Sequence, residues 1–255
     1  MSLIITPLTG IPIIAVGDDL VEIIDNALRK DQISLTNGDI IVIAQKIISK
    51  SEGQFVNLSE LEPSLKAKEW SLSTEKDPRL VELILQESKE IIRTRRGAII
   101  VEHRLGFVCA NAGIDHSNVI AESGESEEIV LLLPENPDLS AQNLRGKLEE
   151  KHGVRIGVMI IDSHGRAWRL GTVGTAIGIS GLPGLVDLRG KPDMFGNKLK
   201  ITEVGAADEL AAACSLVMGQ ASEGTPIVHV RGFPYELKVS SLSELLRPKE
   251  QDLFR

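Results

Sequence analysis

Acidic, hydroxyl and guanidinium side chains follow one short apolar segment of the chain. The run 158–161 is apolar, and Asp162, Ser163, Arg166 and Arg169 come soon after it. A carboxylate at the end of a buried strand loses its hydration unless it is paired or binds a cation. Two interpretations of Asp162 are therefore open. It caps a helix or pairs with one of the two arginines, or it binds a hard metal ion for which the Ser163 hydroxyl is a second oxygen donor.

The two arginines and the small residues after them are suited to anionic ligands. A guanidinium group matches carboxylate and phosphate oxygens, and a metal ion nearby would bridge the same anion. We therefore predict a catalytic role for Arg166. Segment 171–181 is almost entirely Gly, Ala, Thr and Ile. Residues this small let backbone N–H groups approach a bulky ligand, or let two chains pack closely, and the sequence leaves both uses open.

Further polar residues follow other apolar segments. Asp115 and Asn118 lie in a loop of small residues, where an Asp is often a turn-former. Lys46 and Lys50 follow their own predicted strand and could add positive charge beside phosphates, and Gln220 lies in a glycine-punctuated loop. Oxygen ligands, basic residues and glycine loops, without a catalytic His or Cys nucleophile, are typical of metal-assisted phosphoryl transfer.

Several common catalytic motifs are excluded by their spacing. Segment 184–192 has one residue too many for a phosphate-binding P-loop, and Pro192 stands where a metal-binding Ser or Thr is required. Gly178, Gly181 and Gly184 do not have the GxGxxG spacing of a dinucleotide-binding turn. The five histidines show no HxxxH or HxH spacing, which argues against a His-based zinc site, and no GxSxG elbow is present.

Hydrophobic periodicity predicts a mixed α/β (α+β) chain. Apolar residues at helical spacing predict helices over 18–30, 62–96, 139–153 and 203–220, with the RTRRG stretch at 93–97 as a solvated helix end. Short β-branched runs predict a strand near the start of the chain, a buried strand between a turn and the polar group that begins at Gln45, and strands over 154–162 and 225–232. Segment 97–118 is predicted to form two strands around a turn near Leu105 and Gly106, followed by a loop. There is no internal repeat and no long linker, so we expect a single module over 1–255 whose lobes, if it has two, cannot be delimited.

Composition restricts the class of protein. The chain has 255 residues, of which 42% are hydrophobic and 25% charged, as in an ordinary globular protein. A formal charge of -8 and 3% aromatic residues argue against nucleic-acid binding. No apolar stretch approaches the length of a membrane span, and the two cysteines form no CxxC pair. We therefore predict a cytoplasmic protein with no membrane association, in which any anionic ligand is met locally by metal ions or a few basic groups.

Several long motifs, taken in order, carry a resemblance to a known family. They are PLTGIPII, NGDIIVIAQKIISKSEG, RLGFVCANAGIDHSNV, IIDSHGRAWRLGTVGTAIGISG, DMFGNKLKITEV, ADELAAACSLVMGQ and GTPIVHVRG. From about Pro7 to Gly232, the chain resembles the coenzyme F420-0:L-glutamate ligases, which are gamma-glutamyl ligases of deazaflavin biosynthesis.

The resemblance implies an activity and a fold. These enzymes add L-glutamate to the lactyl carboxylate of F420-0 and extend a gamma-linked glutamate tail, converting GTP to GDP and phosphate. They use two divalent cations, Mg²⁺ or Mn²⁺, and K⁺ assists them. A two-lobed α/β monomer that forms an intertwined homodimer is expected. Many relatives are fused to a nitroreductase-like domain, which we do not expect here.

The resemblance also implies roles for particular residues. Asp115 and Asp162 would hold one metal ion, and Ser163 and Gln220 would touch the second. The nucleotide would contact Ile11, Pro12, Ile13, Ile14, Gln45, Lys50, Asn118, Met218, Gly219, Gln220, Ala221, Ser222, Glu223, Gly224 and Thr225. Relatives carry Thr where Ser163 stands, which keeps the hydroxyl. Several carry Glu where Gln220 stands, and an amide oxygen is a weaker metal ligand than a carboxylate.

The implied reaction has a physical reason for each component. A carboxylate is a poor electrophile, and phosphoryl transfer from GTP turns it into an acyl phosphate that the glutamate amine can attack. Metal ions and basic groups would neutralise and align the converging anions. Two alternatives stay open at this stage: the same ligase chemistry on another carboxylate cofactor or amino acid, and a nucleotide-binding regulator that has lost catalysis.

Overall fold

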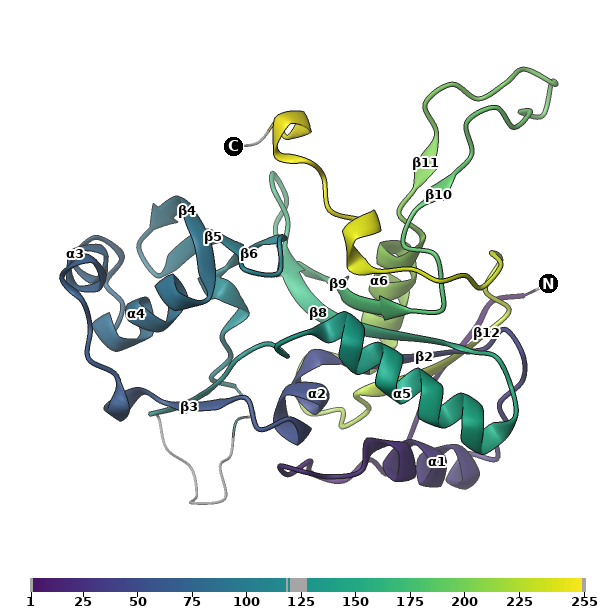
Figure 1. Cartoon of the computed structure of the whole chain (residues 1–255), viewed down its shortest axis with the longest axis horizontal. Coiled ribbons are helices and arrows are strands. Elements are labelled where there is room, and N and C mark those ends of the chain that lie inside the picture. Colours follow the sequence, from purple (N-terminus) through teal and green to yellow (C-terminus); the bar gives the residue numbers. More distant parts are fainter. Residues whose placement is uncertain (1, 118, 120–127, 254–255) are drawn as a thin grey trace.

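The chain folds into a larger and a smaller lobe (Figure 1). The computed structural model describes residues 2–117, 119 and 128–253. The larger lobe is built on a five-stranded sheet, and the smaller lobe on a three-stranded sheet with two helices. The predicted two-lobed α/β architecture is therefore confirmed.

The five-stranded sheet has the order β1-β12-β2-β8-β9. Its strands are β1 (Ile4–Pro7), β12 (Ile227–Arg231), β2 (Ile40–Ala44), β8 (Gly157–Gly165) and β9 (Thr172–Ser180). β2 and β8 are parallel, and the other neighbours are antiparallel. Residues 40–43 of β2 and 157–161 of β8 are buried and mostly β-branched, as expected for strands covered on both faces.

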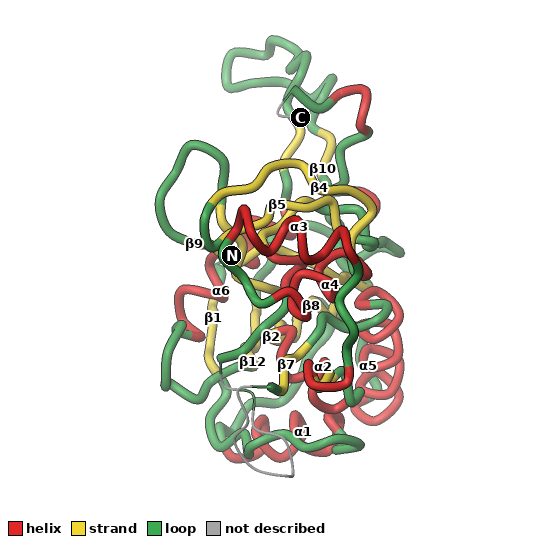
Figure 2. The backbone as a smooth tube through the Cα atoms, turned by 90° about the vertical axis from the view of Figure 1, so that its left-hand side faces the viewer, coloured by secondary structure: helices red, strands yellow, loops and turns green. Residues whose placement is uncertain are grey.

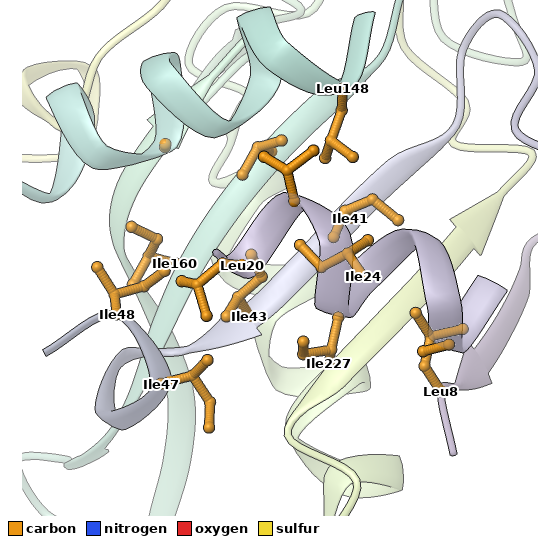
Figure 3. Close-up of a cluster of buried hydrophobic side chains, with 14 of the residues drawn as sticks. Leu8, Leu20, Ile24, Ile41, Ile43, Ile47, Ile48, Leu148, Ile160 and Ile227 are labelled. Atoms are coloured by element: carbon orange, nitrogen blue, oxygen red, sulfur yellow. The ribbon is translucent and has the colours of Figure 1, made fainter. Parts of the chain in front are cut away.

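Helices cover both faces of this sheet. α1 (Leu20–Lys30), α2 (Gln45–Ser51) and α5 (Pro137–His152) lie on one face, and α6 (Ala206–Met218) lies on the other. Figure 3 shows Leu20 and Ile24 of α1 packed with Ile43 of β2 and Ile160 of β8. The predicted end of α5 is confirmed, because Gly153 adopts a left-handed conformation (φ 66°) at its C-terminus.

The small residues of β9 serve the packing of these helices. A Cβ atom on Gly174 would lie 2.5 Å from the carbonyl oxygen of Ala211 in α6, and one on Gly178 would lie 2.5 Å from Cβ of Pro137 in α5. The two uses left open for segment 171–181 were ligand approach and contact between chains. At these two glycines the structure shows a third use, the close approach of helices to both faces of the sheet.

The smaller lobe joins two helices to short strands. It contains α3 (Leu65–Thr74), α4 (Pro78–Gln86), a three-stranded sheet of β4 (Ser88–Arg95), β5 (Ala98–His103) and β6 (Val108–Ala110), and a pair formed by β3 (Phe55–Asn57) and β7 (Ile129–Leu131). Short 3-10 helices occur at Leu58–Glu60, Asn111–Gly113, Leu242–Glu244 and Lys249–Gln251.

The prediction of helix over 62–96 is wrong for its last third. Residues 88–95 form strand β4, and the stretch predicted as a solvated helix end leads into the turn to β5. β4 carries charged side chains on an edge strand, so its apolar positions are too sparse to separate a strand from a helix. Its pairing with the apolar strand β5 decides the conformation.

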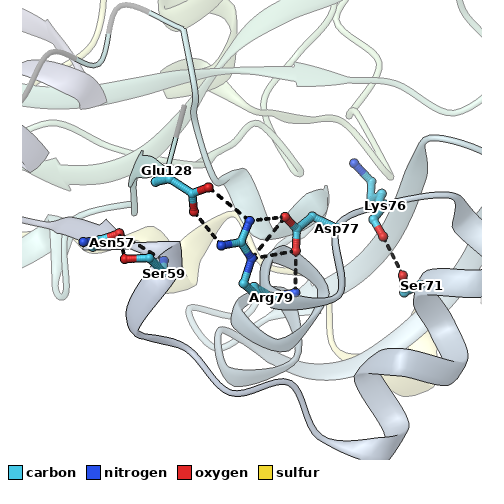
Figure 4. A network of polar contacts seen from close by, with 7 residues as sticks. All are labelled: Asn57, Ser59, Ser71, Lys76, Asp77, Arg79 and Glu128. Carbon is cyan, nitrogen blue, oxygen red and sulfur yellow. Dashed lines mark hydrogen bonds and ion pairs between the residues drawn. The ribbon is translucent and has the colours of Figure 1, made fainter. Parts of the chain in front are cut away.

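Within the smaller lobe, an arginine joins the start of α4 to the residue that precedes β7. The Arg79 guanidinium donates from NH1 to Oε2 of Glu128 and from NH2 to Oδ2 of Asp77, both at 2.6 Å (Figure 4). Asp77 also caps α4, accepting from the backbone N–H of Arg79. The chain is thereby held where it returns from the smaller lobe toward the larger one.

A hairpin arm projects from the larger lobe. β10 (Val186–Asp187) and β11 (Glu203–Val204) form its base, and the side view of Figure 2 shows this arm and α1 at opposite ends of the molecule. Met194, Phe195 and Ile201 on the arm are between 87% and 97% exposed. Within the described residues, no helix is long and apolar enough to cross a membrane.

Candidate active site

Two parallel strands bring the first site residues together. β2 and β8 pair in parallel, with Ala44 opposite Ile161, so Gln45 and Asp162 both follow the point where this pairing ends. Ligands of α/β sheets bind outside the carboxyl ends of parallel strands, because the helices and loops that follow leave a crevice there. The predicted strand ends thus lie next to each other.

The smaller lobe contributes Asp115 to the same edge. Its backbone exchanges two hydrogen bonds of 2.9 Å with Leu131 of β7. Its carboxylate accepts a hydrogen bond from Gln45 Nε2 at 2.5 Å, and Lys46 Nζ lies 3.3 Å from its other oxygen. Lys46 also reaches the Ser117 hydroxyl at 3.1 Å. Contacts to the larger lobe, rather than a local turn, therefore orient this side chain.

Strand β8 continues past Asp162, which corrects the prediction that the strand ends there. Asp162 pairs with Thr175 and Ser163 with Gly174 of β9, and the strand runs to Gly165. Successive side chains of a strand point to opposite faces. Asp162 therefore faces the same side as α2, and Ser163 faces the side of α6.

Partners on each face hold these two side chains. Asp162 accepts from the backbone N–H of Ser163 at 2.8 Å, and His164 Nε2 lies 3.1 Å from its Oδ2. The Ser163 hydroxyl donates to Gln220 Oε1 at 2.8 Å, and Gln220 Nε2 donates to the Ser215 hydroxyl at 2.9 Å. Within the described residues, Asp162 neither caps a helix nor pairs with an arginine, so that interpretation is wrong.

A cavity of about 730 Å³ opens between these side chains. Its wall includes α2, the segment around Asp115, the end of β8, and the loop that joins α6 to β12. The predicted site residues in its wall are Gln45, Lys50, Asp115, Asp162, Ser163, Met218, Gly219, Gln220, Ala221, Ser222, Glu223, Gly224 and Thr225. Residues far apart in the sequence thus line one site.

Opposite charges in the cavity are incompletely compensated. Burial raises the pKa of the Asp115 carboxyl, and the nearby Asp162 charge raises it further, although Lys46 acts in the opposite direction. Burial also lowers the pKa of the Lys50 ammonium, and the neighbouring Lys46 charge adds to this effect. The two carboxylates would gain from a cation, and the two lysines would gain from an anion. A metal–nucleotide complex supplies both.

The donor atoms at Asp115 and Asp162 fit a hard divalent cation. No group of three or more His, Cys, Asp or Glu side chains able to hold a metal occurs among the described residues. Mg²⁺ in phosphate-transfer sites commonly has one or two carboxylates and completes its shell with water and substrate phosphates. Two nearby carboxylates are enough for such an ion. Ser163 and Gln220 offer only neutral oxygens, which suit a second and weaker position.

Some predicted residues lie outside the described wall of the cavity. Segment 11–14 precedes α1; Ile14 is buried in the core of the larger lobe, whereas Ile13 is 82% exposed. Arg166 lies on the exposed turn between β8 and β9, where it donates to the backbone oxygen of Leu170 at 3.1 Å. Asn118 is outside the described residues, so its predicted nucleotide contact stays a prediction.

Sequence reasoning missed His164 as a member of the site. It is 9% exposed and lies next to Asp162, and its ring packs on Phe107 with centroids 5.2 Å apart. Phe107 in turn stacks on His103. The signal was the spacing of two between Asp162 and His164, which places both on one face of a strand. A strand that ends at Asp162, as predicted, does not include His164.

Comparisons with known proteins show the family to which the chain belongs. The family model described as F420-0:Gamma-glutamyl ligase matches residues 10–232. The coenzyme F420:L-glutamate ligase of Methanothermobacter thermautotrophicus is 46% identical over 257 residues, covering 100% of both chains. Those of Methanopyrus kandleri and Archaeoglobus fulgidus are 47% and 39% identical, covering 94% and 100% of this chain and 92% and 97% of their own. This chain belongs to the F420-0:gamma-glutamyl ligase family.

Proposed function

We propose that this protein is a GTP-dependent ligase that adds L-glutamate to coenzyme F420-0 and extends a gamma-linked glutamate tail, releasing GDP and phosphate. Family membership supports the ligation of glutamate. The observation that carries the nucleotide-dependent part is the meeting of Asp115 and Asp162, from different lobes, in one cavity that also contains Lys46 and Lys50.

The proposed reaction has two balanced steps. A carboxylate oxygen of the acceptor attacks the γ-phosphorus of GTP, the bond from this phosphorus to the β–γ bridging oxygen breaks, and GDP leaves. The glutamate amine then attacks the acyl phosphate carbon, loses a proton, and phosphate leaves as the amide forms. The first step replaces an oxide leaving group with phosphate, which makes amide formation possible at neutral pH.

Residues of both lobes would take part in the first step. Lys46 and Lys50 would attract the nucleotide phosphates, and the loop 218–225 would provide backbone N–H groups. Gln45 orients the Asp115 carboxylate through its 2.5 Å hydrogen bond. The described wall of the cavity leaves out Arg166, so we propose that it acts from the exposed turn at the cavity edge, on the acceptor anion.

We propose that Asp115 and Asp162 hold one divalent cation, Mg²⁺ or Mn²⁺, and that Ser163 and Gln220 contact a second. When bound, these ions would neutralise phosphate charge and help to align the reacting groups. K⁺ would assist, although we assign no residues to it. The chain has a formal charge of -8, so local cations are needed where a nucleotide, a phosphodiester and glutamate converge.

A homodimer is part of this proposal. The arm between β10 and β11 exposes Met194, Phe195 and Ile201, each more than four-fifths accessible. Large apolar side chains gathered on a projecting segment commonly meet another protein surface. A second copy of the chain would cover them in the intertwined dimer. The molecular mass in solution, measured by light scattering, tests this part independently of activity.

A product assay tests the reaction. The protein is incubated with GTP, Mg²⁺, L-glutamate and F420-0, and the acceptor is followed by mass spectrometry while GDP is measured. Mass increases by whole glutamyl residues, matched by GDP release, are expected. Glutamyl transfer only to another carboxylate acceptor would replace F420-0 as the substrate. GTP binding without GDP release, with all substrates present, would indicate a regulator and contradict the proposal.

A further inference from the structure

The turn between β8 and β9 presents an exposed indole beside the cavity. Gly165 and Thr172 pair across the hairpin, and both line the cavity. The six residues between them, 166–171, are exposed and lie outside the described wall of the cavity. Trp168 at this tip is 89% exposed and has a backbone φ of 63°, in the left-handed region that bulky residues rarely adopt. Residues in such rarely adopted backbone conformations cluster at active sites and ligand-binding segments.

The same turn is positively charged in an acidic protein. It contains Arg166 and Arg169 and no acidic residue, whereas the whole chain has a charge of -8. Neither guanidinium forms an ion pair with any described residue; Arg166 donates only to the Leu170 backbone oxygen, which stabilises the turn. Trp168 lies between these two cations in the sequence. An exposed indole on a turn that also carries two guanidinium groups is suited to a ligand that is both aromatic and anionic.

We propose that Trp168 and Arg169 form the binding platform for the acceptor, an anionic deazaflavin. The indole stacks on the flat ring system, and the Arg169 guanidinium binds the phosphodiester. This inference rests on the proposed function, because the reaction requires an acceptor whose carboxylate reaches the cavity. The platform holds the other end of that acceptor, and Trp168 selects for an aromatic group there.

The volume of the cavity is too small for all three substrates, which supports a binding platform outside it. A volume of about 730 Å³ is typical of a site for one drug-sized ligand, yet the proposed reaction brings three substrates together. With the nucleotide and glutamate inside, the ring of the acceptor must lie beyond the edge. Trp168 is three residues past Gly165, so the Cα atoms of these two residues lie at most about 10 Å apart, the span of three residues of extended strand. The carboxylate end of the acceptor would then enter beside Asp162 while its ring stacks on the turn.

The first test is equilibrium binding of F420-0, measured without GTP or glutamate. The chain has two tryptophans, Trp70 and Trp168. F420-0 should quench the part of the fluorescence that comes from Trp168, and the Trp168→Phe variant lacks this part. Trp168→Ala should weaken F420-0 binding roughly 5- to 100-fold, the range expected for the loss of one stacking partner. Trp168→Phe should retain most of the affinity. Leu72→Ala removes another exposed apolar side chain, 84% accessible on α3, and should bind as the unchanged protein does.

The second test uses steady-state kinetics. Trp168→Ala and Arg169→Ala should raise the KM for F420-0 and leave the KM for GTP unchanged. Arg169→Lys should raise the KM for F420-0 less than Arg169→Ala does. Unchanged F420-0 binding and KM in Trp168→Ala would overturn the platform even if the protein ligates glutamate. A fall in molecular mass together with an equal rise in both KM values would assign Trp168 to the subunit contact instead. F420-0 quenching of Trp168 without any ligation would support the platform and contradict the proposed function.

Discussion

Gln45 and Asp115, 70 positions apart in the sequence, are joined by a hydrogen bond of 2.5 Å from Nε2 to Oδ2. Gln45 is buried at the start of α2, and its other amide atom, Oε1, accepts from the Ser49 hydroxyl at 3.0 Å. Both ends of the amide are therefore occupied by protein partners. The predicted contact of Gln45 with the nucleotide stays untested, and the contacts observed give it another role, the orientation of Asp115 across the lobe boundary.

Replacement of Gln45 by Ala should weaken divalent cation binding. Asp115 would lose its neutral hydrogen-bond donor, and its carboxylate would no longer be held in one orientation. Removing a hydrogen-bond partner of a metal-ligating group commonly lowers metal affinity or activity about 10- to 100-fold. Mn²⁺ titration followed by electron paramagnetic resonance measures the affinity directly. Gln86→Ala, an exposed glutamine at the end of α4, is the matched control and should bind Mn²⁺ normally. Equal Mn²⁺ affinity in both variants would contradict the positioning role.

Asp115→Asn should stabilise the metal-free protein while it abolishes ligation. Burial and the Asp162 charge raise the pKa of Asp115 above its ordinary value, so the charged form is disfavoured in the folded state. Asn keeps an oxygen that can accept from Gln45 and removes the charge. Residues placed for function commonly reduce stability in this way. Urea unfolding at pH 7 in the presence of a chelator should show a higher midpoint for the variant, with no glutamyl product in the ligation assay.

The pH dependence of this effect has a defined sign. Because the folded-state pKa of Asp115 is raised, the folded protein binds more protons than the unfolded chain at acidic pH, and stability falls as pH rises through that pKa. The Asn variant lacks this loss, so the stability difference should grow from low pH to neutral pH. Added Mg²⁺ should stabilise the unchanged protein more than the variant. A constant difference across this range would show that the Asp115 charge is not responsible.

The sequence allowed the type of most elements to be predicted, but not how they meet. Strand β2 was identified as a short β-branched run between a turn and a polar group, and helix α6 because its apolar residues recur at helical spacing. Strand β4 was missed because its charged edge residues adopt a strand only through pairing with β5. Local pattern fails where a non-local partner decides the conformation.

The sequence allowed the residue types of the site to be predicted, but only part of their arrangement in space. Asp115 and Asp162 were selected as acids beside apolar segments, yet their meeting depends on the parallel pairing of β2 with β8 and on the bridge from Asp115 to Leu131. Neither contact is written in local spacing. His164 was missed for a related reason, because β9 extends β8 beyond the point where the apolar run ends.

Asp39 should be essential for stability and not for catalysis. Its carboxylate is buried at the start of β2 and accepts from Arg231 Nε at 2.9 Å, while His229 Nε2 lies 2.9 Å from its other oxygen. Although burial alone would raise it, hydrogen bonds from Arg231 and His229 hold the pKa of Asp39 far below its ordinary value. Asp39→Ala leaves these partners uncompensated and should cost about 3–5 kcal/mol of unfolding free energy.

Urea unfolding of Asp39→Ala at neutral pH measures this cost. Because the folded-state pKa of Asp39 is lowered, its contribution is present above the unfolded-state pKa and is lost as pH falls toward the folded-state value. The variant should therefore differ most from the unchanged protein near neutrality and least in strong acid. At a temperature where the variant stays folded, its KM for GTP should be unchanged, since Asp39 is at the opposite end of β2 from the cavity.

Gln220→Glu should strengthen the weaker of the two proposed cation positions. Gln220 Oε1 accepts from the Ser163 hydroxyl, and both groups line the cavity near Asp162. A carboxylate at this position could accept from Ser163 in the same way, and it adds the negative charge that hard cations prefer. Without metal, a third acid near Asp115 and Asp162 should lower the unfolding midpoint through repulsion. With Mn²⁺ in excess, the order of stability should reverse, and calorimetric titration should show tighter binding of the second ion.

Glu223, which already lies on this loop and accepts from the backbone N–H of Ala221, supplies the control: Glu223→Gln changes the charge of the same loop by one unit without altering the Ser163 contact. If both variants shift Mn²⁺ binding only in proportion to net charge, Gln220 is not a ligand and the second position lies elsewhere.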